Sequence, residues 1–321
     1  MAPGGSSLLA RGHGVAASKT DSKAHGRNVA QSAQSRLWKL SRACVLLCAL
    51  ASAMACATAA SFQMPEGPWT PDPSAPGIFE EASAPCRGVR TLTAEIGVRG
   101  QAGPSKIRGR VIAGFERGGA LRLEAPAPFG APIFILVARA NRAVLWLPRD
   151  RRVLRDAPVE DVLEAITGLR RSSDDLLALV AGCLTSASTP EGAGRRSARG
   201  WLIVDLPEAT RAFLTRDGQA WRISAGRQDA TGARGSWSVS YADFSLNFPG
   251  SIRVWQDVGP AGQPGSSAAL ILQVSQLETN VPIDSRAFEL VVPPDATRLT
   301  IDELRQSGPL ADRAAGPGSG G

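Results

Sequence analysis

The sequence predicts a mainly β protein, an incomplete (unclosed) antiparallel β-barrel of about a dozen strands with a short helical hairpin as its lid. Two observations support this. Apolar and polar residues alternate along most of residues 92–292, and only residues 158–182 have the spacing of helices. The stretch Leu121–Leu136 also reads as two strands joined by a Pro128-Phe129-Gly130 turn. Because a sheet of this size curls, we expect a cavity on its concave face.

The first 55 residues are expected to be an N-terminal extension followed by a signal peptide. The cations Arg36, Lys39 and Arg42 precede the apolar run Ala43–Ala55, which ends in small residues. A run of this length fits the apolar region of a secretory signal and is too short to span a bilayer. We therefore expect an exported chain that begins near residue 56.

Two cleavage sites compete at the end of this signal. Residues 53–56, AMAC, resemble a bacterial lipobox, in which Cys56 becomes the acylated N-terminus, whereas Ala57-Thr58-Ala59 offers an ordinary small-x-small site. We favour the lipobox because a small residue precedes the cysteine. The protein would then be lipid-anchored, through chains such as palmitate, at the periplasmic face of the outer membrane of a Gram-negative bacterium. The alanine after Cys56 fits that destination by the enterobacterial sorting rule.

The net charge of +7 belongs mainly to the leader. Residues 1–55 contain seven Lys or Arg and one Asp, which leaves 29 basic and 28 acidic side chains in the remainder. A nearly neutral domain is a poor candidate for binding nucleic acid. Both histidines, His13 and His25, also lie in the leader, which excludes Ser-His-Asp catalysis and histidine metal sites from the mature domain. We expect no cofactor and no metal.

The domain is expected to span residues 86–308. Residues 56–85 would be the lipidated cysteine and a Pro-rich tether, and residues 309–321 a disordered tail. The segment at 64–81, MPEGPWTPDPSAPGIFEE, is rich in proline and lacks periodicity, a composition that favours an extended chain.

Two cysteines remain in this domain. Cys44 and Cys48 leave with the signal and Cys56 is used for lipid, so Cys86 and Cys183 are left as a pair in an oxidising compartment. We expect them to form a disulfide, which would close a loop of about a hundred residues and stabilise the fold by about 4 kcal/mol. The alternative is two separate buried thiols.

Period-2 alternation defines the strands on both sides of the helices. In the first strand, Leu92, Ala94, Ile96 and Val98 alternate with polar residues, whereas Ile133–Val137 is apolar on both faces. The strands expected after the first are Ile107–Phe115, Arg122–Glu124, Ile133–Val137, Val144–Leu147, Arg152–Arg155, Trp201–Leu206, Arg211–Thr215, Trp221–Ala225, Trp237–Phe244, Ile252–Trp255, Leu270–Leu277 and Phe288–Val292.

Two short amphipathic helices are expected between these groups of strands. Pro158 suits the first turn of a helix that Gly168 ends, and Ser172 or Ser173 caps a second helix that Gly182 closes. The apolar positions are Val159, Val162, Leu163 and Ile166 in the first helix and Leu176, Leu177, Leu179 and Val180 in the second.

The Pro128-Phe129-Gly130 turn carries a large aromatic at its tip, which turn geometry does not require. One interpretation is that Phe129 folds back and covers the edge of the core. The other is that Phe129 protrudes and enters a membrane or an apolar partner. On a lipid-tethered domain without histidine, we favour the exposed side chain.

In its order of hairpins, its Pro-x-Gly turn and its helical hairpin, the chain resembles LolB, the outer-membrane receptor for lipoproteins. The segment PVEDVLEAITG at 158–168 precedes a leucine-rich helix that ends at Gly182, and LTRDGQAWRI at 214–223 resembles the strand-turn-strand after the helices of that family. Residues 278–295 are more similar to the closing strands of the periplasmic relative LolA. The likeness covers most of residues 88–297.

The resemblance implies binding of acyl chains and a function in lipoprotein localisation. In such proteins the apolar residue of the Pro-x-Gly turn aids delivery into the membrane, a role that would fall to Phe129. The implied partners are lipoprotein cargo, a periplasmic carrier and the membrane surface, and we expect a monomer. The candidates for the cavity wall are Ile133, Ile135, Trp146, Trp201, Trp221 and Trp237, each with ordinary sheet core as the alternative, and for the inner face of the lid Leu163, Ile166, Leu176 and Leu177.

Two other classes of function stay open. The first is an enzyme, because acidic residues around the helices would permit paired-carboxylate hydrolysis. These residues are Asp150, Asp156, Glu160, Asp161, Asp174 and Asp175. Their positions at helix starts fit capping and the helix dipole, so we expect no enzyme. The second is an envelope-stress sensor or a structural lipoprotein, which would use the same fold for binding.

Overall fold

The structure, a computed structural model, describes residues 65, 67–186, 189–230, 235–258 and 266–308. The predictions of a signal peptide at 1–55, of an acylated Cys56 or cleavage near Ala59, and of a disordered tail at 309–321 fall outside these residues. All elements described below belong to one compact unit of the chain, Ala59–Gly321.

The strands follow one another in a regular antiparallel order. In chain order they are β1 Trp69–Asp72, β2 Thr91–Ala102, β3 Ser105–Glu116, β4 Ala120–Ala125, β5 Phe134–Arg139, β6 Arg142–Leu147, β7 Arg152–Pro158, β8 Gly194–Ser197, β9 Leu202–Leu206, β10 Thr210–Asp217, β11 Ala220–Gln228, β12 Trp237–Ser245, β13 Phe248–Val258, β14 Ser266–Thr279 and β15 Thr297–Arg298. The described residues thus contain three short strands, β1, β8 and β15, that alternation did not predict.

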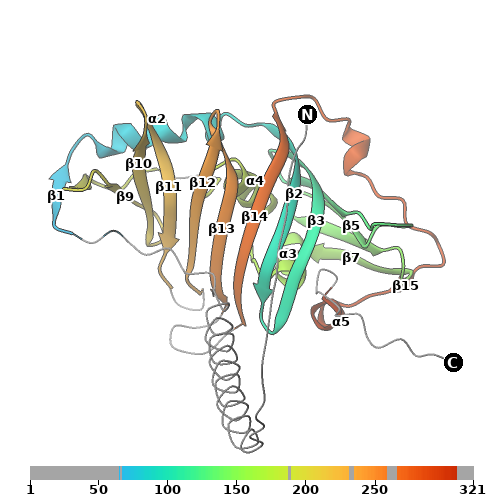
Figure 1. Ribbon diagram of the computed structural model, residues 1–321. Coiled ribbons are helices and arrows are strands. Elements are labelled where there is room, and N and C mark those ends of the chain that lie inside the picture. Colours follow the sequence, from blue (N-terminus) through green and yellow to red (C-terminus); the bar gives the residue numbers. More distant parts are fainter. Residues whose placement is uncertain (1–64, 66, 187–188, 231–234, 259–265, 309–321) are drawn as a thin grey trace, which may run out of the picture. The chain divides into compact units, whose positions relative to one another are not determined.

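These strands form one continuous sheet (Figure 1). Its order is β1-β8-β9-β10-β11-β12-β13-β14-β2-β3-β4-β5-β6-β7-β15, and only β15 pairs in parallel, with β7. Within the described residues the edge strands β1 and β15 do not pair with each other, so the barrel is unclosed. The predicted fold class is therefore confirmed.

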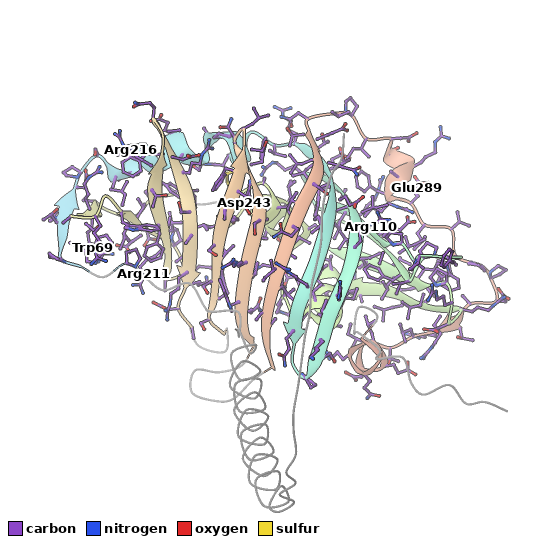
Figure 2. The ribbon with its side chains drawn as sticks, viewed as in Figure 1. Trp69, Arg110, Arg211, Arg216, Asp243 and Glu289 are labelled. Carbon is purple, nitrogen blue, oxygen red and sulfur yellow. A yellow bond between two sulfur atoms is a disulfide. The ribbon has the colours of Figure 1, made fainter. Side chains whose placement is uncertain are left out.

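The two faces of the sheet differ in the way that the alternation predicts. On β2 the side chains of Leu92, Ala94, Ile96 and Val98 are all buried, and the residues between them are more exposed. On the next strand Val111 is buried, while its neighbours Arg110 and Ile112 project from the opposite face. Figure 2 labels Arg110 on that outer face. The apolar face carries the main core of the domain.

Two short helices cover the apolar face, as predicted. They are α3 (Val159–Thr167) and α4 (Ser173–Val180), and Figure 1 shows them on one side of the sheet, behind β13, β14 and β2. The α3 stripe of Val159, Val162, Leu163 and Ile166 is buried. Ser172 caps α4 by accepting a hydrogen bond from the Asp175 backbone N–H.

The prediction of an extended tether up to residue 85 is wrong. Residues 69–72 form β1, which pairs with β8, and Ala75–Arg87 forms helix α2. Pro76 lies in the first turn of α2, where the missing N–H costs no hydrogen bond, and Phe79 and Cys86 are buried on its inner face. The proline-rich composition concealed an apolar stripe at helical spacing.

The strand predicted at Phe288–Val292 is also wrong. The chain forms a 3-10 turn, η1 (Ser285–Phe288), and then an irregular segment in which Val291 is 94% exposed. Phe288 is buried where η1 packs against β4 and β5, and Arg122 donates a hydrogen bond to the Ala287 carbonyl. The alternation of apolar and polar residues in this segment therefore does not indicate a paired strand. Only Phe288 anchors the segment in the core.

The segment after this turn leads back to the lid. Leu299 donates its backbone N–H to the Val153 carbonyl, and helix α5 (Ile301–Ser307) follows with a capping box between Thr300 and Glu303. Leu304 is buried and α5 packs beside α3. The lid helix α3 is thus also in contact with α5.

Cys86 and Cys183 form the disulfide that was expected. The bridge joins the end of α2 to the residues just after α4, with a Cα–Cα distance of 5.7 Å. Beside it the buried Tyr241 hydroxyl donates a hydrogen bond to the Cys183 carbonyl at 2.5 Å. Both interactions fix the end of α4 on the sheet.

We predict that the paired change C86A/C183A lowers the free energy of unfolding by about 4 kcal/mol, because the unfolded chain regains the freedom of a loop closed by residues 97 apart in sequence. Denaturant unfolding of the variant and of the reduced wild-type protein measures this loss. The two should agree. An unfolding midpoint equal to that of the oxidised wild type would contradict it.

Candidate ligand-binding cavity

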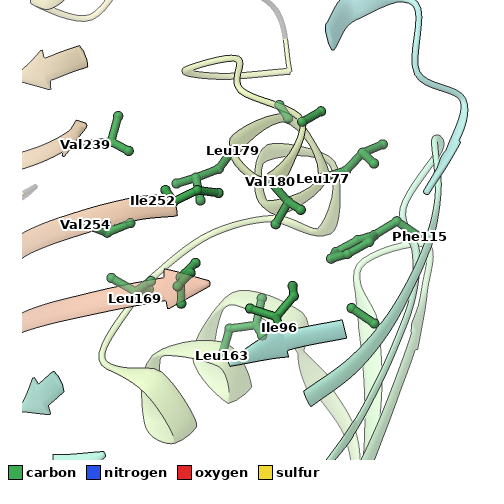
Figure 3. Packing of buried hydrophobic residues seen from close by; sticks show 14 of the residues in the cluster. Ile96, Phe115, Leu163, Leu169, Leu177, Leu179, Val180, Val239, Ile252 and Val254 are labelled. Atoms are coloured by element: carbon green, nitrogen blue, oxygen red, sulfur yellow. The ribbon is translucent and has the colours of Figure 1, made fainter. Parts of the chain in front are cut away.

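An apolar cavity lies between the concave face of the sheet and the two lid helices. Its volume is about 60 Å³, and only Thr167 and Arg171 among its lining residues are polar. The apolar lining residues are Ile96, Val98, Val111, Phe115, Leu123, Phe134, Leu163, Ile166, Leu169, Leu176, Val180, Leu270 and Leu272. In Figure 3 the side chains of Ile96, Phe115, Leu163 and Val180 are drawn among the packed residues of this region.

The side chains that form the cavity walls are determined by which alternate residues of each strand face the lid helices. Buried residues of β2, β3 and β14 alternate with exposed ones, so every second side chain points toward α3 and α4. Pockets that hold drug-sized ligands measure about 300–1,000 Å³, so this cavity is much smaller than such a pocket.

The lid is held at its ends. At the end of α3, Gly168 has a left-handed φ of 76°, and a Cβ there would lie 2.8 Å from the Ala268 Cβ and 2.9 Å from the Ala102 Cβ. At the start of α4, Asp174 accepts hydrogen bonds from the backbone N–H groups of Gly118 and Gly119. These contacts join the helices to β2, β14 and the β3–β4 turn.

Of the four residues predicted for the inner face of the lid, Leu163, Ile166 and Leu176 line the cavity. Leu177 is buried in the core but does not line it. The helical spacing therefore placed the lid correctly.

The six predicted residues of the cavity wall do not line the cavity. On β5 the inward side chains are Phe134 and Leu136, and Ile135 lies on the opposite face, where it pairs with Trp146. Ile133, just before the strand, is half-buried at the core edge. Since this stretch is apolar on both faces, the phase was misjudged by one residue, which reverses the face of every side chain.

The tryptophans of the second half of the sheet have structural roles. Trp201 packs with Trp69 against Phe213 in a separate cluster. Trp221 lies beneath the guanidinium groups of Arg196 and Arg216, each 5.1 Å from its ring centroid. Trp237 is buried in the main core and donates its Nε1–H to Gln228. For Trp237 the alternative interpretation, an ordinary side chain of the sheet core, is therefore correct.

Arg171, the one cation on the described cavity wall, was not among the predicted site residues. Its side chain lies over the Trp237 ring, with Cζ 4.1 Å from the centroid. Its Nε and Nη2 atoms are buried and have no hydrogen-bond partner among the described residues. Burial lowers the pKa of this guanidinium, and the nearby Asp175 opposes that effect. The feature of the sequence that could have identified Arg171 is the presence of a cation in the brief connection between two apolar helices.

Phe129 is exposed over 90% of its surface, so the interpretation in which it covers the core is wrong. The turn has a left-handed Gly130, with φ of 77°, and is closed at its base by a hydrogen bond from the Ile133 N–H to the Ala125 carbonyl. Arg149 donates a hydrogen bond to the Phe129 carbonyl at 3.4 Å.

Among the described residues, no helix has the length and apolar content needed to cross a bilayer.

The acidic residues around the lid have structural partners. Arg170 forms ion pairs with Glu160, Asp161 and Glu164, and these acids lie along α3. Asp175 accepts hydrogen bonds from the Ser172 and Ser186 hydroxyls and from the Ser186 N–H. Capping and ion pairing therefore account for these carboxylates.

The fold and the cavity define an open antiparallel half-barrel whose helical lid covers an apolar cavity. No family model and no curated protein matches the chain.

Solved structures similar to this one include a LolA superfamily protein from Nitrosomonas europaea (TM-score 0.41, 10% identity, 66% of this chain and 96% of that one). Others are an outer membrane lipoprotein-sorting protein domain from Vibrio parahaemolyticus (0.38, 13%, 67% and 96%) and a DUF1329 family protein from Desulfovibrio piger (0.41, 10%, 68% and 98%).

Proposed function

We propose that this protein binds acyl chains between α3, α4 and the concave face of the sheet, and takes part in lipoprotein localisation at the outer membrane. The observation that carries the proposal is the apolar cavity beneath an amphipathic lid. Its walls offer contacts to a hydrocarbon chain and little to a polar substrate. The role at the membrane follows from the LolB-like turn and from the lipobox-like AMAC at 53–56.

Acyl binding supplies the energy to open the lid. In this proposal the lid moves outward as a chain enters. Each buried CH₂ group contributes about 0.8 kcal/mol, so a chain of about ten carbons contributes about 8 kcal/mol toward this opening. A chain that enters would replace the contacts that Leu163, Ile166 and Leu176 make with the sheet. The apolar surface of the lid then stays covered in both forms.

Phe129 and the lipid anchor act together in this proposal. Burial of one Phe side chain contributes about 1.5 to 3 kcal/mol, which is too little to hold a protein on a bilayer. It is enough for a contact made by a protein already tethered through Cys56. The exposed aromatic would then enter the membrane where the acyl chain is delivered.

The proposal is a binding function without catalysis. The carboxylates of α3 are engaged by Arg170, and those at the start of α4 accept hydrogen bonds that fix the lid. Their partners support a structural role for these acids.

We predict that Val111→Phe lowers the affinity for a fluorescent apolar probe, N-phenyl-1-naphthylamine, by at least about tenfold, because the larger ring occupies the cavity that Val111 lines. Fluorescence titration measures the change. The matched control is Ile112→Phe, on the same strand but half-exposed on the opposite face, which should bind as the wild type does. Equal affinities in the two variants would contradict a ligand under the lid.

We predict that Phe129→Glu leaves the free energy of unfolding unchanged within about 0.5 kcal/mol, since the side chain is 90% exposed, and reduces transfer of a lipoprotein into vesicles. Vesicle flotation of the transferred lipoprotein measures the second effect. Leu246→Glu, at an equally exposed apolar residue in the β12–β13 turn, is the control. Undiminished transfer by a folded Phe129→Glu protein would refute the membrane contact.

A further inference from the structure

The most unusual polar group in the domain is the guanidinium of Arg171. It is placed in the wall of an otherwise apolar cavity, and its Nε and Nη2 atoms are buried without a hydrogen-bond partner among the described residues. Arginine stays charged in proteins, so this is a buried cation with unused donors. Such a group is costly unless it is paired.

No acid among the described residues forms an ion pair or a hydrogen bond with Arg171, although the charge of the nearby Asp175 favours its charged form. The neighbouring Arg170 takes the three acids of α3, and the Asp175 carboxylate is occupied by Ser172 and Ser186. Burial raises the pKa of Tyr241, which keeps its phenol neutral.

The contact with Trp237 offsets only part of the cost. A desolvated cation is stabilised by an indole ring at 4.1 Å, but this contact uses the face of the guanidinium and not its N–H groups. The two orphan atoms, Nε and Nη2, share one edge of the planar group. Two parallel donors on one edge match the two oxygens of a carboxylate or phosphate.

We infer that Arg171 is the binding site for the anionic headgroup, carboxylate or phosphate, of the amphiphile whose chain occupies the cavity. The inference rests on the proposed binding of acyl chains, and it adds amphiphiles with an anionic headgroup to acylated lipoproteins as ligands of this cavity. The chain packs against the sheet and the lid, and the oxyanion accepts both hydrogen bonds from the edge of Arg171. The cation that costs stability in the empty protein becomes paired when the ligand binds.

Displacement of N-phenyl-1-naphthylamine from the purified full chain tests this inference. The competitors share one chain length and differ in headgroup: dodecanoate, dodecyl phosphate and the neutral 1-dodecanoylglycerol, at a pH where both acids are ionised. We expect the anions to bind about ten- to hundredfold more tightly than the neutral lipid, the range for hydrogen bonds to a charged group. The anion with the larger preference identifies the headgroup as carboxylate or phosphate.

The decisive variant is Arg171→Met, with Arg170→Met as its matched control. Arg171→Met should bind all three competitors with the affinity of the neutral lipid, whereas Arg170→Met should keep the preference for anions. The melting temperature of Arg171→Met should equal or exceed that of the wild type, because an unpaired buried charge is removed and Met keeps a contact with Trp237. A purely structural arginine would instead lower it.

Arg171→Lys provides a second variant that keeps the charge and should retain part of the preference. An unchanged anion preference in Arg171→Met overturns the inference while leaving acyl binding intact. Failure of the probe and of all three competitors to bind the wild type overturns the proposed function, and the inference with it.

Discussion

The structure depends on the covering of one apolar sheet face by short helices. The concave face buries side chains from most of the strands, and α3 and α4 are among the elements that cover it. Helices of nine and eight residues are not stable alone in water, so they exist because the sheet provides a surface for their apolar stripes. Sheet and lid therefore depend on each other, and a ligand able to replace the lid contacts can compete for the same surface.

The fixed points of the lid lie at its ends. The disulfide and Tyr241 hold the end of α4, Gly168 holds the end of α3 against the sheet, and α5 packs beside α3. The α3–α4 connection between these points carries Arg170, which is paired with acids of α3, and Arg171, which faces the cavity. In the proposed complex, the α3–α4 connection would thus lie beside the point where the acyl chain joins the headgroup, with apolar contacts for the chain and the cation of Arg171 for the headgroup.

Periodicity predicted those parts of the fold in which one face is buried and the other is wet. β2 and the α3 stripe follow directly from it. The exposed Phe129 was favoured on other grounds, because turn geometry does not require an aromatic and the domain was expected to be lipid-tethered. The Cys86–Cys183 pairing followed from cysteine counting in an oxidising compartment.

The predictions were wrong where the pattern of apolar and polar residues does not determine the local structure or the face on which a side chain lies. Ile133–Val137 is apolar on both faces, so the sequence could not show that Phe134 and not Ile135 lines the cavity. Proline in the first turn of α2 concealed a helix. At Arg171 the sequence offers only a cation between two apolar helices, because the environment of that cation depends on which carboxylates fold close to it and which are already paired.

The most direct test of acyl binding beneath the lid is photocrosslinking in cells. A photoreactive amino acid replaces Leu176, which lines the cavity from α4, and in a parallel strain it replaces Ile112 on the opposite face of the sheet. Capture of an acylated lipoprotein at position 176 and not at position 112 is the predicted result, with the crosslink on the acyl chain. Capture at position 176 of only non-acylated protein would contradict the account.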